Sequence, residues 1–344
     1  MSAQFLYRGK ESYGIFRENM LGWKKQKSEA VQMRDLKSTC RVALVQAEPV
    51  LFDKAKGLEK TLRLIREASE KFPELIVFPE LFIPGYPFGM NFGFGTGTRE
   101  APGRVDWLRY YDASIVVPGP ETEALGAAAK AAGAYLSIGV SERVAESGTL
   151  YNTNLIFSPD GALVSHHRKL KPTGSERLIW GDAQSHYFPV VDTPWGAMGS
   201  LICWESYMPL ARVALYEKGV TLYLSPNTND NAEWHNTISH IAIEGKCFFI
   251  NSDMLITKAS YPRDLATYDR DVARLPDVIC RGGSCIMDPF GHYLTEPVWD
   301  EEAIIVAELD MAQASAARME FDPCGHYSRP DVLELRVHEE GDTK

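Results

Sequence analysis

The sequence predicts an α/β fold, in which helices cover either one mixed sheet or two sheets packed face to face. Two observations support this prediction. From about residue 41, short apolar segments of β character alternate with longer segments whose apolar residues recur at helical spacing. Turn sequences also join some neighbouring β segments directly, which is typical of hairpins. A length of 344 residues allows one large domain or two.

The first half of the fold begins with a predicted buried strand at residues 41–47 (RVALVQA). Four apolar residues at helical spacing then predict a helix over residues 55–72. The other elements expected here are strands at 75–78, 135–140, 154–157 and 162–166, and a helix at 121–132. The turn sequence Ser-Pro-Asp-Gly at 158–161 joins the last two strands, so they should form a hairpin.

In the second half, a predicted strand over residues 198–202 ends at Cys203, and Pro209 suits the first turn of a helix that reaches about residue 218. Further elements are expected as strands at 221–224 and 248–251 and a helix at 234–246. Strands at 284–287 and 304–308, with the turn sequence Asp-Pro-Phe-Gly between them, predict a late hairpin. No linker interrupts residues 41–310, so 1–40 and 311–344 are interpreted as terminal extensions.

The charge of the chain argues against some classes of partner. With a net charge of −10 and a pI near 5.4, the protein is a poor candidate for binding nucleic acid or an anionic membrane. Residues 1–40 carry a net charge of +4, so we expect this basic extension to dock on an acidic surface of its own chain or of a neighbour.

Cysteine usage and the N-terminal sequence predict a cytoplasmic protein. The six cysteines are scattered without a CxxC pair, which indicates reduced and mostly buried thiols. The N-terminus lacks the apolar block of a signal peptide, and no segment approaches the roughly 18 apolar residues that cross a bilayer.

The first candidate for chemistry is Glu80, which directly follows the predicted strand at 75–78. A carboxylate there lies at the edge of the sheet where α/β active sites are found. Its apolar neighbours Leu81, Phe82 and Ile83 would desolvate it and favour a group that can hold a proton. The alternative is a solvated glutamate at the end of a strand.

The second candidate is Lys169, in the basic segment HHRKLKP at residues 166–172. A lysine just beyond a strand can face negative charge that develops during a reaction. The alternative is a basic surface loop. The adjacent His166 and His167 should point to opposite faces of their strand, so they do not form a metal site by themselves.

The third candidate is Cys203, in the segment LICWE. A cysteine between a strand and a helix is held at a tight bend that presents its sulfur, as in a nucleophile elbow. The start of the next helix and a nearby lysine would both favour the thiolate. The alternative is a buried structural cysteine.

In the segments around these three candidates, the chain resembles the nitrilase superfamily of carbon-nitrogen hydrolases, and within it the true nitrilase branch. The resemblance runs from about Arg41 to Glu308, with a further piece near 324–335. The segments that carry it are FPELFIPGYP at 78–87, HRKLKPTGSERLIWGD at 167–182, LICWESYMPLAR at 201–212 and HIAIEGKCF at 240–248. Cysteine followed by Trp-Glu favours the nitrilase branch over amidases and carbamoylases.

The resemblance implies a four-layer α-β-β-α sandwich without a metal or other cofactor. It implies Glu80 as general base and acid, Lys169 as electrostatic stabiliser, Cys203 as nucleophile and Glu176 as a second carboxylate that supports the lysine. The substrate would be a small nitrile, and the chain would form a homodimer, a larger homo-oligomer or a spiral.

Trp204, beside the nucleophile, and Tyr86, in the glutamate segment, are the residues we expect to bind substrate. Ser206 departs from the family, because relatives commonly carry asparagine there. The Gly-rich segment 88–98 departs too, where relatives carry bulkier aromatic residues. Both departures lie close to the motifs and bear on the substrate pocket.

Four functions follow from this sequence. The first is hydrolysis of an organic nitrile to carboxylic acid and ammonia. The others are an amidase or carbamoylase with the same residues, a cyanide- or nitrile-hydrating enzyme that releases the amide, and a scaffold without catalysis. The intact Glu80, Lys169 and Cys203 argue against the scaffold.

Overall fold

The computed structural model describes residues 36–184 and 187–338. The chain divides into two compact units, Met1–Lys37 and Ser38–Lys344, and the following description concerns the second. Nearly all of the predicted basic extension lies outside the described residues. The domain boundaries at residues 40 and 310 therefore stay predictions.

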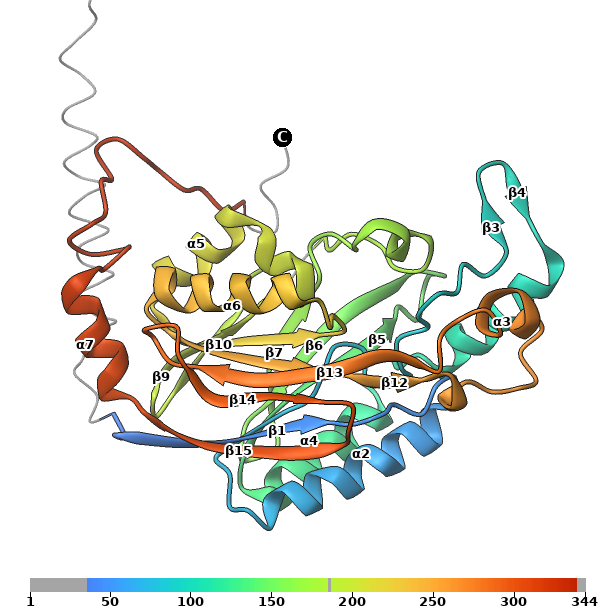
Figure 1. The fold of residues 1–344 in the computed structure, drawn as a ribbon, viewed down its shortest axis with the longest axis horizontal. Helices are drawn as coiled ribbons and strands as arrows, with labels where there is room; N and C mark the ends of the chain where they lie inside the picture. Colours follow the sequence, from blue (N-terminus) through green and yellow to red (C-terminus); the bar gives the residue numbers. More distant parts are fainter. Residues whose placement is uncertain (1–35, 185–186, 339–344) are drawn as a thin grey trace, which may run out of the picture. The chain divides into compact units, whose positions relative to one another are not determined.

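The strands form two large sheets and one small hairpin (Figure 1). The six-stranded sheet has the order β15-β1-β2-β5-β6-β7, with β1, β2 and β5 parallel. The seven-stranded sheet has the order β12-β13-β11-β10-β9-β8, with β14 added beside β13 and with β9, β10 and β11 parallel. The strands are β1 (Thr39–Gln46), β2 (Leu75–Val77), β3 (Phe94–Gly95), β4 (Thr98–Arg99), β5 (Tyr135–Arg143), β6 (Leu150–Phe157), β7 (Leu163–Arg168), β8 (Val190–Thr193), β9 (Gly196–Ser200), β10 (Val220–Asn227), β11 (Phe248–Asp253), β12 (Leu255–Thr257), β13 (Val278–Met287), β14 (Tyr293–Trp299) and β15 (Ala303–Asp310).

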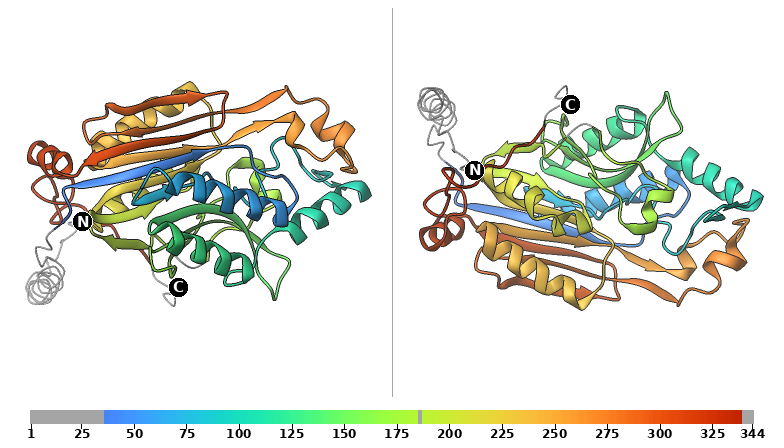
Figure 2. Two further views of the ribbon diagram at one scale, coloured as in Figure 1. Left: turned by 90° about the horizontal axis from the view of Figure 1, so that it is seen from below. Right: turned by 90° about the horizontal axis from the view of Figure 1, so that it is seen from above.

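The helices lie on the outer faces of the two sheets. Helices α2 and α4 pack on the six-stranded sheet, and α5 and α6 pack on the seven-stranded one (Figure 2). The α-helices are α2 (Lys54–Ser69), α3 (Ala101–Ala113), α4 (Pro120–Ala132), α5 (Pro209–Glu217), α6 (Ala232–Gly245) and α7 (Ala312–Glu320). Short turns of 3₁₀ helix include η1 (Gly174–Leu178) and η2 (Cys203–Tyr207).

Three apolar layers separate these four structural layers. Val42 and Leu44 of one sheet pack with Leu222 and Ile250 of the other in the central layer. A second cluster fills the space beneath α2 and α4, and a third fills the space beneath α5 and α6. Since each sheet buries both faces, its central strands are rich in apolar residues on both sides. The predicted α-β-β-α sandwich is confirmed.

Local sequence signals explain most of the helix ends. The Asp53 carboxylate accepts a hydrogen bond from Lys56 N and caps the start of α2. Helices α4 and α5 each begin with a proline. Proline is tolerated there because the N–H group that it lacks would have no partner within the helix. Helix α4 ends at Gly133, whose φ of 64° lies in the left-handed region that glycine adopts without strain. The predicted hairpin at residues 154–166 is confirmed, because β6 and β7 pair antiparallel.

The predicted late hairpin is wrong. The turn at residues 288–291 joins β13 to β14, whereas β15 pairs with β1 along all eight of its residues. Strand β14 escaped prediction because it lies outside the main order of its sheet and is only half-buried, which allows it to contain Glu296 and Pro297.

Helix α3 and the β3–β4 hairpin were also missed. Helix α3 exposes Val105 and Leu108 and has no clear apolar face. A polar contact fixes it instead, because the buried Asp106 carboxylate accepts hydrogen bonds from Ala266 N and Thr267 N. The hairpin lies mostly in the Gly-rich segment 88–98, for which the sequence predicted no strand.

One buried side chain ties the two sheets together. The Gln46 amide, at the end of β1, accepts from Gly283 N and Ser284 N and donates to Val298 O and Glu301 O. All four of its bonds reach across to β13, β14 or the turn that follows. Gln46 therefore fixes the sheets at the end where the strands carry their functional residues.

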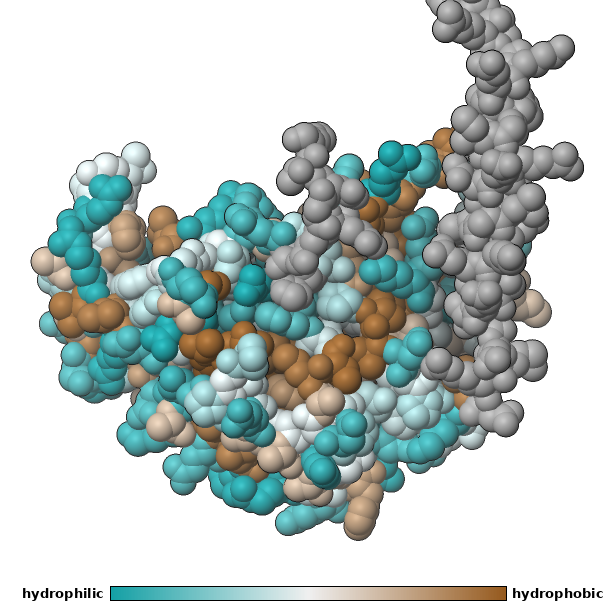
Figure 3. All heavy atoms as spheres, turned by 180° about the vertical axis from the view of Figure 1, so that it is seen from behind, coloured by the Kyte–Doolittle hydropathy of each residue, from teal (hydrophilic) through white to brown (hydrophobic). Residues whose placement is uncertain are grey.

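The surface mixes hydrophilic and hydrophobic side chains, with a hydrophobic band across one face (Figure 3). In the described part of the chain, no helix combines the length and apolar character needed to cross a bilayer. Five of the six cysteines are buried, which confirms the prediction that most of the thiols are buried.

Candidate active site

Glu80 lies just past the end of β2, fully buried between the two sheets. The segment around it passes so close to β5 that only glycine fits at position 139. A Cβ on Gly139 would lie 2.4 Å from Leu81 N and 2.6 Å from Glu80 Cα. The same segment bonds to β5 through Gly139 N to Pro79 O and Phe82 N to Gly139 O. The neighbouring strand therefore sets the position of the Glu80 backbone.

Three predicted residues come together in one buried cluster. Lys169 Nζ lies 2.7 Å from Glu80 Oε1 and 3.0 Å from Glu176 Oε2, so one ammonium bridges two carboxylates. Asn152 Nδ2 donates to the same Glu80 oxygen at 2.6 Å. Thr173 N donates to Glu176 at 2.8 Å. The supporting place predicted for Glu176 beside Lys169 therefore exists in the structure.

Burial and charge set the protonation of this cluster. Burial raises the pKa of Glu80 more than the Lys169 ammonium lowers it, so the net shift is upward. Burial alone would lower the pKa of the Lys169 amine, but the two carboxylates outweigh it and raise that pKa above its usual range. Lys169 is therefore a fixed positive charge, and Glu80 can hold a proton, as its apolar neighbours predicted.

Cys203 follows β9 and opens the 3₁₀ turn η2, with a φ of 52°. This left-handed conformation is uncommon for a residue with a side chain and is typical of functional bends. Burial and the Glu80 charge raise the pKa of its thiol, while Lys169 and a hydrogen bond with the Thr228 backbone lower it, and the net shift is upward. Lys169 therefore favours the thiolate, as expected for a nearby lysine, but burial of the thiol and the charge of Glu80 outweigh it.

The reason lies in the local geometry. Cys203 begins a short 3₁₀ turn, and the next α-helix begins at Pro209, as predicted, so its N-terminus is separated from the thiol by this turn. The buried thiol also faces two carboxylates and one ammonium. It therefore needs a base to remove its proton before it can attack. Glu80 Oε2 suits this task, because among the described residues it has no hydrogen-bond partner.

The two residues predicted to bind substrate occupy different surroundings. Tyr86 is nearly buried, and its hydroxyl donates to Glu176 Oε1 at 2.8 Å, whereas Lys169 contacts the other oxygen of that carboxylate. The Trp204 indole is 45% exposed and packs edge-on against Tyr207. Tyr86 therefore contacts the predicted catalytic groups, and Trp204 lies at the surface beside Cys203.

Two further residues at this site were not predicted. Asn152 donates a hydrogen bond to Glu80. It could have been found in the sequence as a polar residue within the otherwise largely apolar strand LYNTNLIF. The Glu205 carboxylate accepts hydrogen bonds from Ile202 N and Leu170 N. The sequence placed Glu205 in the motif that follows Cys203, but nothing in the sequence indicates that its side chain contacts residue 170.

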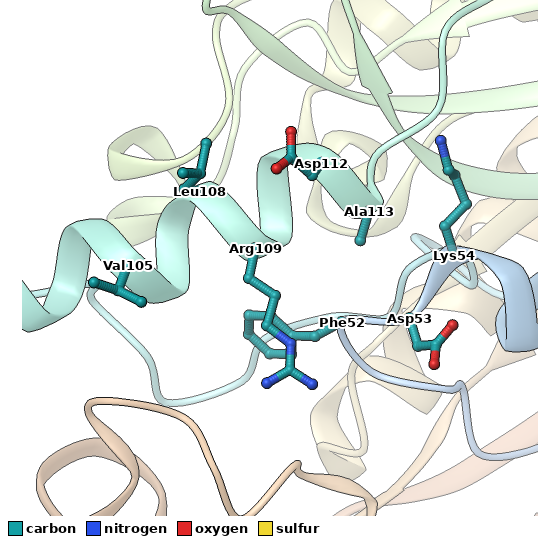
Figure 4. Close-up of a pocket in the computed structure, with 8 residues that line it drawn as sticks. All are labelled: Phe52, Asp53, Lys54, Val105, Leu108, Arg109, Asp112 and Ala113. Atoms are coloured by element: carbon teal, nitrogen blue, oxygen red, sulfur yellow. The ribbon is translucent and has the colours of Figure 1, made fainter.

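An open pocket of about 490 Å³ lies elsewhere, between α3 and the start of α2 (Figure 4). None of its lining residues belongs to the buried cluster. Its basic side chains already have acidic partners, since Arg109 pairs with Asp264 and Lys54 with Glu121. We therefore place the chemistry at the buried cluster.

A family model for carbon-nitrogen hydrolases matches residues 41–319, which contain every residue of this cluster. The chain belongs to the carbon-nitrogen hydrolase family. Within this family, it is 47% identical over 301 residues to an aliphatic nitrilase of Sinorhizobium fredii, covering 87% of this chain and 96% of that one. It is 43% identical to nitrilase 2 of Arabidopsis thaliana, over 87% and 88% of the two chains.

A third relative, from Lupinus angustifolius, is a bifunctional nitrilase/nitrile hydratase with 42% identity over 87% of this chain and 86% of its own. Solved carbon-nitrogen hydrolase structures share the fold. The enzyme of Helicobacter pylori superposes with a TM-score of 0.67 at 20% identity, over 85% of this chain and 96% of that one. Nit3 of Saccharomyces cerevisiae has a TM-score of 0.64 at 21% identity, over 87% and 100%.

Proposed function

We propose that this carbon-nitrogen hydrolase is a nitrilase that converts a small organic nitrile to the carboxylic acid and ammonia, with Glu80, Lys169, Glu176 and Cys203 as its catalytic set. The observation that carries the proposal is the buried contact of Lys169 with both carboxylates, beside a thiol on a strained bend. Relatives named nitrilases, 43–47% identical over most of the chain, support the choice of nitriles.

In the first step, Glu80 accepts the Cys203 proton while the sulfur attacks the nitrile carbon. The new C–S bond uses the thiol's electron pair, and the nitrile nitrogen takes the proton from Glu80 to give a thioimidate. Glu80 suits both transfers because burial raises its pKa, which favours a carboxyl group that can take up a proton and release it again. No redox partner is needed.

In the second step, Glu80 removes a proton from water, which adds to the thioimidate carbon. The resulting tetrahedral carbon carries the Cys203 sulfur, an oxygen and an amino group. Lys169 stabilises the oxygen as an anion while Glu80 protonates the nitrogen, so ammonia leaves and a thioester remains. A second water then releases the carboxylic acid and restores the thiol.

Release of the amide is the second candidate outcome. If the nitrogen of the tetrahedral intermediate stays neutral, the C–S bond breaks instead and the amide leaves. Relatives at 40–42% identity are named bifunctional nitrilase/nitrile hydratases, so this route has precedent among similar chains. We propose the acid as the main product, because Lys169 holds its charge beside the carboxylate that supplies the proton.

The test is to incubate the purified protein with aliphatic, aromatic and arylacetic nitriles and to quantify acid, amide and ammonia. Cyanide and simple amides serve as comparison substrates. Cys203→Ala should abolish turnover, and Lys169→Ala should lower kcat by about 100-fold or more, as does loss of one oxyanion donor. Mostly amide from every nitrile would indicate a hydratase, and hydrolysis of amides alone would indicate an amidase.

For Tyr86 and Trp204 we propose roles at the substrate. Tyr86 would present its ring to the substrate while its hydroxyl orients Glu176. Trp204 would cover the nitrile from the outer side. We also propose that the chain acts as a homodimer or a larger homo-oligomer, as the family resemblance implies, which a mass measurement in solution tests directly.

A further inference from the structure

The Glu205 carboxylate makes three hydrogen bonds at the base of the candidate active site. Its Oε2 accepts from Ile202 N at 2.7 Å and pairs with His167 Nε2 at 2.8 Å. Its Oε1 accepts from Leu170 N at 2.8 Å. The side chain is fully buried, as is that of His167. Bonds from neutral donors to a buried carboxylate are among the stronger hydrogen bonds in proteins.

These bonds join the two segments that carry the nucleophile and the lysine. Ile202 immediately precedes Cys203, and Leu170 immediately follows Lys169. The two segments are far apart in sequence and follow β9 and β7, which belong to different sheets. One carboxylate therefore sets the spacing between the backbones next to the sulfur and next to the ammonium.

The conformation of Cys203 adds to this argument. A φ of 52° on a residue with a side chain costs on the order of 1 kcal/mol or more, and it persists only where the surroundings hold it. Glu205 N donates to Ile202 O while its side chain accepts from Ile202 N, so Glu205 fixes both backbone polar groups of the residue before the bend.

We propose that Glu205 is a positioning residue that holds the Cys203 sulfur against the Glu80–Lys169 pair and thereby sets the ratio of acid to amide released. The proposal rests on the proposed nitrilase function. In the tetrahedral intermediate, ammonia leaves only if Glu80 reaches the nitrogen and Lys169 reaches the oxygen. If the sulfur drifts from them, the C–S bond breaks first, the sulfur recovers its proton and the amide leaves.

The chain offers a matched control in the neighbouring histidine. His166 and His167 point to opposite sides of β7, as predicted from their adjacency. His166 pairs with the buried carboxylate of Glu142 at 2.8 Å, as His167 pairs with Glu205. The other partners of Glu142 are the side chains of Thr153 and Arg168. Glu142→Gln therefore removes a buried carboxylate with a histidine partner and leaves the bonds to residues 170 and 202.

The experiment compares Glu205→Gln, Glu142→Gln and the wild type on a nitrile that the wild type hydrolyses. A glutamine at 205 must turn its NH₂ group toward one of the two N–H donors, so it breaks one side of the link. We expect kcat to fall about 10- to 100-fold, as for a misplacement of up to 1 Å, with KM within about threefold. The amide share should rise at least twofold in Glu205→Gln and stay unchanged in Glu142→Gln.

Hydrogen–deuterium exchange supplies a readout independent of turnover. In Glu205→Gln, the peptides with residues 168–172 and 200–207 should both exchange faster than in the wild type. In Glu142→Gln, the peptide with residues 200–207 should exchange at the wild-type rate. A folded Glu205→Gln variant with wild-type kcat, product ratio and exchange overturns the proposal. A wild type that releases no acid or amide from any nitrile overturns the proposed function instead, and the exchange data then decide whether the link exists.

If Glu205→Gln does not fold, His167→Gln takes its place, because it keeps both backbone bonds of Glu205 and weakens only the third. It should raise the amide share by a smaller factor. An unchanged product ratio in His167→Gln together with an unfolded Glu205→Gln overturns the positioning role and leaves Glu205 a purely structural residue.

Discussion

The buried Glu142 carboxylate should make the stability of this protein depend on pH in a defined acidic range. Burial by itself would raise its pKa, but hydrogen bonds and charge from Arg168 and His166 lower it to about 2, against an ordinary value of 4.5. Each pKa difference of one corresponds to about 1.4 kcal/mol, so the ionised carboxylate contributes at most about 3 kcal/mol.

The direction of the effect follows from the depressed pKa. The contribution is fully present above the unfolded value of 4.5 and is lost as the pH falls toward the folded value of about 2. About half of it should remain near pH 3. Glu142→Gln imitates the protonated carboxyl, so the stability gap between wild type and variant should be widest at neutral pH and narrow in acid.

The assay is urea unfolding of wild type and Glu142→Gln at pH 7, 5 and 3, at one fixed protein concentration. Glu67→Gln is the control, because it removes an exposed pair with Arg63 that should contribute less than about 0.5 kcal/mol. The reasoning would be refuted if wild type and Glu142→Gln differ by less than about 1 kcal/mol in unfolding free energy at pH 7, or if their difference stays constant down to pH 3.

Two other predictions concern Glu80. Gly139→Ala places a Cβ 2.6 Å from Glu80 Cα, so the folded variant should lose at least about tenfold in kcat with little change in KM; wild-type kcat would contradict this contact. Asn152→Leu removes a hydrogen bond that lowers the pKa of Glu80, so the acid limb of the kcat/KM profile should move to higher pH. Asn154→Leu, on the same strand, should leave that limb in place, and a shift toward lower pH in Asn152→Leu would disprove the assignment.

Local patterns predicted most helices and strands and the order of the candidate residues, whereas the four-layer arrangement followed from the family resemblance. Continuous apolar strands mark sheets buried on both faces, and the segments that end them mark where Glu80, Lys169 and Cys203 lie. The supporting contacts could not be predicted, because they join residues distant in sequence. Asn152 reaches Glu80 across 72 positions, and Glu205 reaches Leu170 across 35.

The errors have the same origin. The partner of β15 is β1, at the other end of the domain, and no local pattern distinguishes this pairing from a hairpin with the strand before the turn. The pKa of the Cys203 thiol depends on how deeply the sulfur is buried and on the facing carboxylates, and neither is visible in the segment LICWE. Local sequence patterns therefore predicted most helices and strands, but they did not predict long-range strand pairing or the pKa of a buried group.

The pairing of β1 with β15 has a consequence for biosynthesis. Strand β1 is the first of the described strands to be translated, and β15 (Ala303–Asp310), one of its two neighbours in the sheet, is the last of them. Until then β1 presents an open edge of unpaired backbone groups, which other chains can join. Completion of the six-stranded sheet must therefore wait until residues 303–310 have been translated, and a nascent chain stalled before residue 303 should be prone to aggregation or dependent on chaperones.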